Sequence, residues 1–440
     1  MKRVFAVLVV SLGLVIGTAQ EGFENRIDVV RPDAPELAAH GEFDIGVRTV
    51  ELSDPDGFDV VNAVAGEDIP TYDRPLTLEV WYPATLEAGQ EPGGEYTVVT
   101  RDPGLEVTVK GLAVRDAAPN TEAGPFPLII ISHGYPGNRF LMSHLGENLA
   151  TKGYVTVAID HTDSTYSDQA AFASTLLNRP LDQLYVLEQI ANLGAAGGGK
   201  FLEGVVDATQ TGIIGYSMGG YGVVNVVGGG YAEGIIAAPY APADRVLELR
   251  SSANEDYLNS MDSRIKAVIA VAPWGMNVGA WDAESLQGVT TPIMFMAGSA
   301  DDVSGYENGT KAIYDLTTNA ERYLLTFENA NHNAAAPMPA PIETWEPSDN
   351  LDFVPFEHYG DAVWDTVRMN NIAQHFATAF FDHYIKSDEE MAPYLDLVEQ
   401  ASEGIWSVDD AGEPTDEHTY WQGFPNRTAV GLSLMQAKPE

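Results

Sequence analysis

The sequence predicts an α/β protein with a mostly parallel central sheet and helices on both faces. Between residues 127 and 386, short apolar runs with strand character alternate with longer segments of helical spacing. This alternation is typical of parallel sheets covered by helices. Several runs, such as 127–132 (PLIIIS), are apolar at nearly every position, which indicates strands buried on both faces. A strand, a sharp turn and a helix also follow one another directly at 211–227.

The first part of the chain has antiparallel character. A strand is expected at 45–52, and residues 75–82 (PLTLEVWY) alternate between apolar and polar side chains. Residues 83–125 contain Gly and Pro turns, with a hairpin expected from segments 96–100 and 105–110.

The alternating part follows in chain order. Further strands are predicted at 154–159, 213–215, 264–271, 292–297 and 322–327, and helices at 140–151, 169–194 with a break at Pro180, 217–227, 309–317 and 361–386. Gly- and Pro-rich segments 228–263 and 334–360 interrupt this pattern and are interpreted as insertions over the site. We expect a single domain over 20–440, with its core at about 127–386 and an irregular tail.

The first residues have the pattern of a signal peptide. Lys2 and Arg3 give a positive start, residues 4–16 are apolar, and Gly17-Thr18-Ala19 offers small residues for cleavage. The alternative to a signal peptide is a membrane anchor, but the apolar stretch is short for a membrane span. We therefore expect residues 1–19 to be removed near Ala19 and the protein to be secreted or periplasmic. No later stretch approaches transmembrane length, so no membrane association is expected after removal.

The composition excludes several classes of protein. Lys and Arg total 23 against 64 Asp and Glu, a net charge of −41, which disfavours nucleic acid and anionic membranes as partners. A surface that repels itself this strongly is relieved by salt, which suggests a saline habitat; an ordinary acidic exoprotein is the alternative. The chain has no Cys, so thiol nucleophiles and thiolate metal sites are excluded. We expect a monomer.

The segment TGIIGYSMGGYGVV carries the strongest motif. Gly215 and Gly219 flank Ser217 with the spacing G-x-S-x-G, between an apolar strand and a helix. Such a turn holds the serine in strained backbone geometry at its apex, where strand and helix approach too closely for a Cβ atom beside it. The alternative is a Gly-rich turn with an idle serine. No G-x-G-x-x-G follows the first parallel strand, so a dinucleotide cofactor is unsupported.

A serine nucleophile needs a base and a group that orients the base. In doubly wound sheets these groups stand on loops after strands. The loop after PIMFMA contains Asp301 and Asp302, and the loop after RYLLTF contains His332. The order Ser217, Asp301, His332 therefore predicts a catalytic triad. Asp301 is favoured over Asp302 by the spacing from Gly298, although an Asp here can also cap a helix.

The reaction also requires N–H donors for a developing oxyanion. The segment SHGYPG follows the first buried strand, and its backbone can offer the Tyr135 N–H. The Met218 N–H, directly after the serine, is the expected second donor.

At these motifs the chain resembles the α/β-hydrolase fold. The segment HGYPGNRFLMSHLGENLATKGYVTVAIDHTDS resembles plasma-type platelet-activating-factor acetylhydrolases and bacterial dienelactone-hydrolase-like proteins, and more loosely polyester-degrading cutinases. The resemblance covers roughly residues 127–335. It implies a serine carboxylic-ester hydrolase that uses Ser217, Asp301 and His332. Dienelactone hydrolases proper use a cysteine nucleophile, which this chain lacks, so their substrate is not implied.

The cutinase resemblance also implies a substrate wall at Trp274, in the segment APWGM; a buried core Trp is the alternative. Together with Tyr216 and Met276 it predicts an apolar, aromatic cleft. Arg139 is the nearest basic residue to the motifs. Asp160, Asp163 and Asp168 follow a strand, where a solvated loop is favoured over a Ca²⁺ site. No metal and no cofactor are expected.

The sequence therefore predicts a secreted serine esterase that acts through an acyl-enzyme on small aliphatic or aromatic esters, or on polymeric esters. One alternative is a phospholipid deacylase like the platelet-activating-factor acetylhydrolases. A different class of protein, a non-catalytic binding module with a vestigial triad, is the second alternative.

Overall fold

The computed structural model describes residues 24–169 and 171–440. The predicted signal peptide lies outside the described residues. The strands are β1 (Ile45–Phe58), β2 (Thr71–Thr85), β3 (Gly94–Val99), β4 (Glu106–Gly111), β5 (Val114–Arg115), β6 (Ala118–Pro119), β7 (Phe126–Ser132), β8 (Val155–His161), β9 (Val206–Tyr216), β10 (Ile265–Val271), β11 (Ile293–Gly298), β12 (Arg322–Phe327) and β13 (Leu432–Ala437).

The helices lie between these strands. They are α1 (Ser143–Thr151), α2 (Phe172–Gly194), α3 (Met218–Val226), α4 (Glu233–Ile236), α5 (Glu255–Leu258), α6 (Lys311–Leu316) and α7 (Thr366–Tyr384). Short helical turns add Glu36–Ala38, Ala243–Arg250, Met276–Val278, Ser285–Gly288, Tyr306–Thr310, Ile342–Trp345, Pro355–His358, Glu389–Tyr394 and Ala401–Glu403.

Within the described residues, eleven strands form one central sheet. Its order is β13-β12-β11-β10-β9-β7-β8-β2-β1-β5, with β6 beside β2. All neighbours from β8 to β12 pair in parallel. The long strands β1 and β2 pair antiparallel with each other, β2 pairs antiparallel with β8, and β13 pairs antiparallel with β12. The expected hairpin exists as β3 and β4, outside this sheet. The predicted mostly parallel α/β architecture is therefore confirmed.

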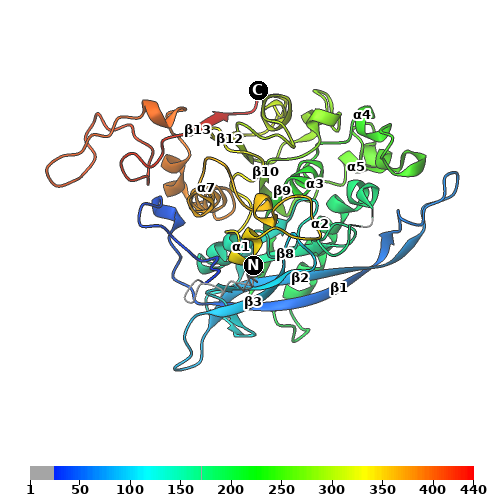
Figure 1. Ribbon diagram of the computed structural model, residues 1–440, viewed down its shortest axis with the longest axis horizontal. Coiled ribbons are helices and arrows are strands. Elements are labelled where there is room, and N and C mark those ends of the chain that lie inside the picture. The colour runs from blue at the N-terminus through cyan, green and yellow to red at the C-terminus, as the bar shows by residue number, and fades with distance from the viewer. Residues whose placement is uncertain (1–23, 170) are drawn as a thin grey trace, which may run out of the picture.

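Helices cover both faces of the sheet. Helices α1 and α7 pack together on one face, and α2 and α3 pack on the other (Figure 1). Alternate residues of β7 enter different cores: Ile129 and Ile131 join the core beneath α1 and α7, whereas Leu128 and Ile130 join the core beneath α2 and α3. Two-sided burial is thus the reason why this strand is apolar at consecutive positions.

The predicted break at Pro180 is wrong, because α2 runs from Phe172 to Gly194 without interruption. Proline lacks the N–H that would bond to the carbonyl oxygen of Leu176, four residues earlier. The hydroxyl of Tyr221 in α3 donates to that oxygen at 3.1 Å, and the hydroxyl of Tyr231 approaches it at 3.4 Å. Tertiary packing supplies the partner that the helix lost.

The tail after residue 386 contains a strand that the sequence pattern did not predict. Strand β13 adds to the edge of the sheet beside β12, with Phe327 opposite Leu432. Figure 1 shows this part of the chain returning to the sheet after a long excursion. Trp421 is buried against Phe376 of α7 and fixes the tail to the domain, whereas Trp406 is partly exposed.

Candidate active site

Ser217 stands at the apex of the turn between β9 and α3. Its backbone has φ 52° and ψ −112°, a strained conformation for a residue with a side chain. The turn is held from three sides. The Ser217 N–H donates to the carbonyl of Val271 at 2.8 Å, and the Ser217 carbonyl accepts from Trp274 N–H at 3.1 Å and Tyr221 N–H at 2.9 Å.

The two glycines of the motif are required by close packing. A Cβ atom at Gly215 would lie 2.3 Å from the carbonyl oxygen of Gly219, and one at Gly219 would lie 2.0 Å from the carbonyl oxygen of Ser132. Both contacts involve backbone and cannot be relieved by a side-chain movement. The spacing G-x-S-x-G therefore sets how closely α3 approaches β9 and β7.

The structure brings Ser217, His332 and Asp301 together. The Nε2 atom of His332 is 3.0 Å from the Ser217 hydroxyl oxygen. The Nδ1 atom of the same ring is 2.9 and 3.0 Å from the two carboxylate oxygens of Asp301. With the proton on Nδ1, the ring donates to Asp301 and its Nε2 can accept a proton from the serine.

Asp301, rather than Asp302, faces the histidine. The Asp301 carboxylate is buried and also accepts the backbone N–H groups of Val303 and Ser304, each at 2.9 Å. Burial alone raises the pKa of Asp301, but the hydrogen bond from His332 and these two N–H groups outweigh it and hold that pKa below its ordinary value. Asp301 is therefore an ionised acceptor for the ring. Asp302 is exposed.

Segment 334–360 and the residues after it brace the histidine loop. The Asp361 carboxylate accepts the Asn331 N–H at 2.6 Å. The Asn333 side chain donates to the carbonyls of Glu357 and Gly360 at 2.9 and 2.8 Å, and accepts the Tyr216 hydroxyl at 3.2 Å. Sequence reasoning missed Asn333 and Asp361; the only signal was the proximity of Asn333 to His332.

The two expected oxyanion donors border the serine. A Cβ atom at Gly134 would lie 3.2 Å from the Ser217 Cβ, so the loop after β7 lies against the nucleophile turn. Met218 opens α3 directly after the serine. Within the described part of the chain, neither the Tyr135 nor the Met218 backbone N–H donates a hydrogen bond to a protein acceptor. Both amides therefore remain available to a ligand.

Ser217 and His332 open into a pocket of about 580 Å³, here called the Ser217 pocket. Its walls come from the loops after β3, β7, β9, β11 and β12 and from residues 353–362. Aromatic side chains supply much of the wall: Tyr135, Tyr216, Phe353 and Phe356. The Tyr216 ring packs on the His332 ring, with 5.1 Å between centroids. Burial raises the pKa of Tyr216, and the charges of Asp301 and Asp302 raise it further, so its hydroxyl stays neutral.

Trp274 and Met276 lie outside the lining of this pocket. The Trp274 ring packs against Phe172 and Tyr221, at centroid distances of 5.3 and 6.0 Å, and Phe172 in turn contacts the ring of Tyr135. Trp274 thus supports the pocket wall from behind. Of the three predicted substrate contacts, only Tyr216 lines the pocket.

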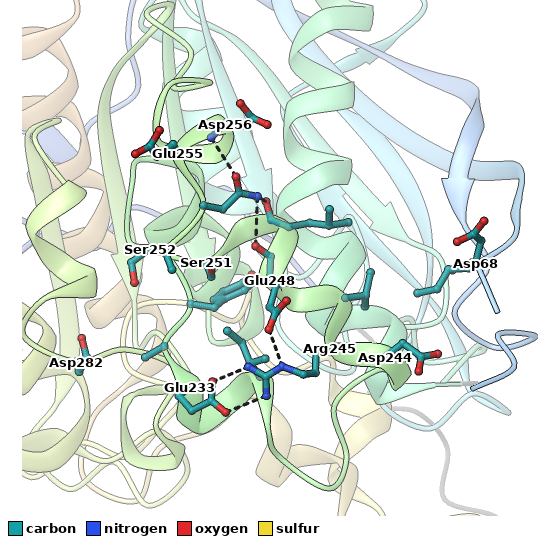
Figure 2. A pocket seen from close by; sticks show the side chains of 18 of the residues that line it. Asp68, Glu233, Asp244, Arg245, Glu248, Ser251, Ser252, Glu255, Asp256 and Asp282 are labelled. Atoms are coloured by element: carbon teal, nitrogen blue, oxygen red, sulfur yellow. Dashed lines mark hydrogen bonds and ion pairs between the residues drawn. The ribbon is translucent and has the colours of Figure 1, made fainter. Parts of the chain in front are cut away.

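The two predicted insertions take different positions. Segment 334–360 contributes Phe353, Phe356 and His358 to the Ser217 pocket, as expected of an insertion over the site. Segment 228–263 contributes none of its lining; it borders a second, acidic hollow of about 1040 Å³ (Figure 2). There Arg245 bridges Glu233 and Glu248. Segment 228–263 includes α4 and α5 and lines this second hollow together with residues 67–69, which lie between β1 and β2. The lining of the Ser217 pocket gives no support to the expectation that this segment covers the site.

The charged residues beside the motifs form ion pairs with one another. Arg139 pairs with Glu79 and Asp160, and so does not face the Ser217 pocket. Asp163 pairs with Arg74 at 3.0 Å, so the expected solvated aspartate loop is instead partly buried and paired. In the described residues no cluster of three His, Asp or Glu side chains has the arrangement of a metal site. Also within them, no helix combines the length and apolarity needed to cross a membrane.

The fold and this site define the class of protein. A ferulic acid esterase from Streptomyces cinnamoneus superposes with a TM-score of 0.53 and 20% identity, covering 81% of this chain and 94% of the esterase. At that identity the likeness concerns the fold alone. The parallel strands of the sheet, the turn that carries Ser217 and the chain order Ser217, Asp301, His332 agree with this fold. The protein has the α/β-hydrolase fold.

Sequence similarity narrows the relationship. A family described as PET hydrolase-like matches residues 107–251. Cutinase est1 of Thermobifida alba is 24% identical over 214 residues, 48% of this chain and 55% of the cutinase. A bis(hydroxyethyl) terephthalate hydrolase of Streptomyces coelicolor is 24% identical over 253 residues, 57% of this chain and 65% of that enzyme. The chain thus spans about half to two thirds of the length of these relatives, and its sequence is similar to theirs over that part. The matched family segment contains Ser217 and ends before Asp301 and His332.

Proposed function

We propose that the protein is a serine carboxylic-ester hydrolase. The observation that carries the proposal is the continuous hydrogen-bonded path from the Ser217 hydroxyl through His332 to Asp301, with distances of 3.0 and 2.9 Å. The path opens into a pocket large enough for an ester and lies beside two amides without protein acceptors. These are the parts that acyl transfer through a serine requires.

The chemistry follows from the geometry. The Ser217 oxygen attacks the ester carbonyl carbon while its proton passes to Nε2 of His332, and Asp301 stabilises the imidazolium that forms. The carbonyl oxygen becomes an oxyanion and accepts the N–H groups of Tyr135 and Met218. The alcohol leaves with the proton from Nε2, which yields an acyl-enzyme on Ser217. Water, deprotonated by the same nitrogen, then releases the carboxylic acid and restores the serine.

The substrates we propose are small aliphatic or aromatic esters, or polymeric esters. The aromatic lining favours an apolar acyl group. Phe356 is 37% exposed at the pocket and packs edge-on against Trp345, which is 54% exposed, with 5.4 Å between ring centroids. Val303, on the acid loop, is 49% exposed. This apolar rim continues the pocket outward and would suit a chain longer than one ester unit. The relatives whose names refer to cutin and terephthalate esters support the same substrate class.

The test compares Ser217→Ala with the wild type on p-nitrophenyl acetate and butyrate. We expect turnover to fall by roughly 10³- to 10⁴-fold or more, and labelling by a fluorophosphonate to disappear. Ser402→Ala, at an exposed serine in the tail, is the matched control and should keep both. Turnover that survives in Ser217→Ala would disprove the proposal.

Two alternatives give different results in the same assay. A phospholipid deacylase would prefer short-chain phospholipids to p-nitrophenyl esters of equal acyl length. A non-catalytic binding module would show neither turnover nor labelling of Ser217. A polyester film, added to the panel, tests whether the exposed rim accepts polymers.

We also propose that residues 1–19 direct export and are removed near Ala19, and that residues 20–440 form one domain. Expression of the full chain in a bacterium, followed by N-terminal sequencing of the exported product, tests the first point. A single cooperative unfolding transition tests the second.

A further inference from the structure

The Ser217 pocket contains one strong cation in a protein of very high negative charge. The chain carries 64 acidic against 23 basic residues. Among the described residues that line the pocket, Arg101 is the only Arg or Lys. It comes from the turn between β3 and β4, far in sequence from the motifs of the site. Nothing in its sequence context marks it, which is why Arg139 was expected to be the nearest cation.

The turn that carries Arg101 is held rigidly. The Arg101 N–H donates to the hydroxyl of the buried Tyr359 at 3.0 Å. The next residue, Asp102, accepts from the Asn350 side chain at 2.8 Å and from the Ser348 hydroxyl. The guanidinium lies over the ring of Phe353, 5.2 Å from its centroid, and Phe353 itself lines the pocket. The cation is therefore positioned before any ligand arrives.

Arg101 has no charged partner of its own. Within residues 24–169 and 171–440, its side chain forms no ion pair and no hydrogen bond with another side chain. Other arginines of this protein are paired, as Arg74 is with Asp182 and Arg139 with Asp160. A half-buried guanidinium without an anion is an open binding position for a carboxylate, which it can contact through two N–H groups.

The acidic groups of the pocket do not fill this position. The Asp361 carboxylate is occupied by the backbone N–H groups of Asn331, Val363 and Trp364. Asp302 and Glu357 also line the pocket, but both are exposed, so solvent screens their charges. The neighbouring His358 is partly buried; its desolvation lowers its pKa to about 3, and the charge of Arg101 contributes to the lowering. His358 is therefore neutral and leaves Arg101 as the charge that a ligand meets.

We propose that Arg101 forms an anion subsite of the Ser217 pocket and gives the enzyme a preference for esters whose acid part carries a second, ionised carboxylate. The inference rests on the proposed ester hydrolysis at Ser217. Half-esters of dicarboxylic acids are such substrates; they are also what remains when a diester or a polyester has been cut once. The subsite would let the protein accept products of a first cleavage as substrates for a second.

The kinetic test compares monomethyl terephthalate, which carries a carboxylate, with dimethyl terephthalate, which is neutral. In Arg101→Gln we expect kcat/KM for the half-ester to fall at least about tenfold, mainly through KM, and the value for the diester to stay within about twofold. Arg101→Lys should retain an intermediate preference. Arg427→Gln removes the same charge at an exposed position outside the pocket and is the matched control.

A binding experiment tests the subsite without hydrolysis. Calorimetric titration of Ser217→Ala with benzene-1,4-dicarboxylate should show binding that weakens at least about tenfold in Ser217→Ala/Arg101→Gln.

The outcomes separate the two proposals. Wild-type protein that cleaves neither ester, with dicarboxylate binding that depends on Arg101, would end the hydrolase proposal and keep the subsite. Cleavage of both esters with the same ratio in Arg101→Gln and Arg427→Gln, or dicarboxylate binding unchanged by Arg101→Gln, would overturn the subsite and leave the hydrolase proposal intact. Circular dichroism and Tm confirm that the variants fold.

Discussion

The carbonyl oxygen of Gly134 faces the guanidinium of Arg179 at 3.4 Å. The same guanidinium donates to the carbonyl of His133 and to the hydroxyl of Ser164, and the His133 Nδ1 atom is 2.7 Å from the Gly134 oxygen. Because a trans peptide holds its C=O and N–H on opposite sides, fixing the Gly134 oxygen aims the Tyr135 N–H away from Arg179. Arg179 is thus a positioning residue for the proposed oxyanion hole.

Arg179→Lys should therefore slow the chemical step more than it weakens binding. Lysine keeps the charge but cannot contact two carbonyls in a fixed plane. We expect kcat for p-nitrophenyl butyrate to fall by roughly 10- to 100-fold, with KM changed by less than about threefold. A variant with an unchanged Tm and wild-type kcat would show that the guanidinium does not orient this peptide. An equal loss of kcat and stability would indicate a structural role only.

The hydroxyl of Tyr221 should matter because Pro180 lacks an N–H. We expect Tyr221→Phe to lower the free energy of unfolding by about 1 kcal/mol in the wild type. In Pro180→Ala the N–H of residue 180 can donate to the Leu176 carbonyl itself. In that background, Tyr221→Phe should therefore lower the free energy of unfolding by less than half as much. Urea unfolding of the four proteins measures the coupling. Identical costs in both backgrounds would contradict this account of how α2 passes Pro180.

Glu147 should make stability decrease as pH rises from about 4.5 to 7. Its carboxylate is buried in α1, where it accepts the N–H groups of Leu112 and Ala113 and the hydroxyl of Tyr96. Burial raises its pKa to about 7, against the opposing effect of these hydrogen bonds. The folded protein then holds a proton that the unfolded chain releases near pH 4.5, so the stabilisation is complete below that pH and lost by pH 7.

The size of this effect is about 3 kcal/mol, from roughly 2.5 pKa units at 1.36 kcal/mol each. Glu147→Gln should remove this part of the pH dependence, although it also loses one N–H acceptor at every pH. Urea unfolding of both proteins between pH 4.5 and 7.5 measures the difference in slope. Parallel curves would show that Glu147 titrates as an ordinary surface carboxylate.

Salt should stabilise the protein. With a net charge of −41, repulsion between surface carboxylates opposes folding, and the screening length falls from about 10 Å at 0.1 M to about 3 Å at 1 M salt. We expect Tm to rise by roughly 5 °C between 0.1 and 1 M NaCl. Sucrose at equal osmolality serves as the uncharged control. A Tm that does not change with NaCl would mean that repulsion between surface carboxylates does not destabilise the fold. It would also weaken the suggestion of a saline habitat.

The sequence predicted the parallel core well because each strand there is marked locally. The apolar run 127–132 predicts a buried strand, and the motif around Ser217 predicts a strand-turn-helix, without reference to distant parts of the chain. Asp301 and His332 could be predicted for the same reason, since each stands one loop beyond a recognisable strand. The proposed site thus came from short-range patterns combined with one rule of topology.

The remaining parts depend on contacts between distant segments. The continuity of α2 at Pro180 needs a hydroxyl from α3, and the position of Arg101 needs a hairpin folded against segment 353–362. For Trp274 the resemblance implied a substrate wall, with a core Trp as the alternative; its ring packs against Phe172 and Tyr221 and lies outside the lining of the Ser217 pocket. None of these partners is marked by spacing along the chain.

The pairing of β13 with β12 determines when, during synthesis, the edge of the sheet beside the His332 loop is covered. The loop of His332 begins directly after β12, where Glu328 N–H bonds to the carbonyl of Gly431 at 2.8 Å. During synthesis, Ser217 and the imidazole leave the ribosome long before the strand that borders their loop. Until β13 emerges and docks against β12, a nascent chain would hold its nucleophile and base beside an open sheet edge.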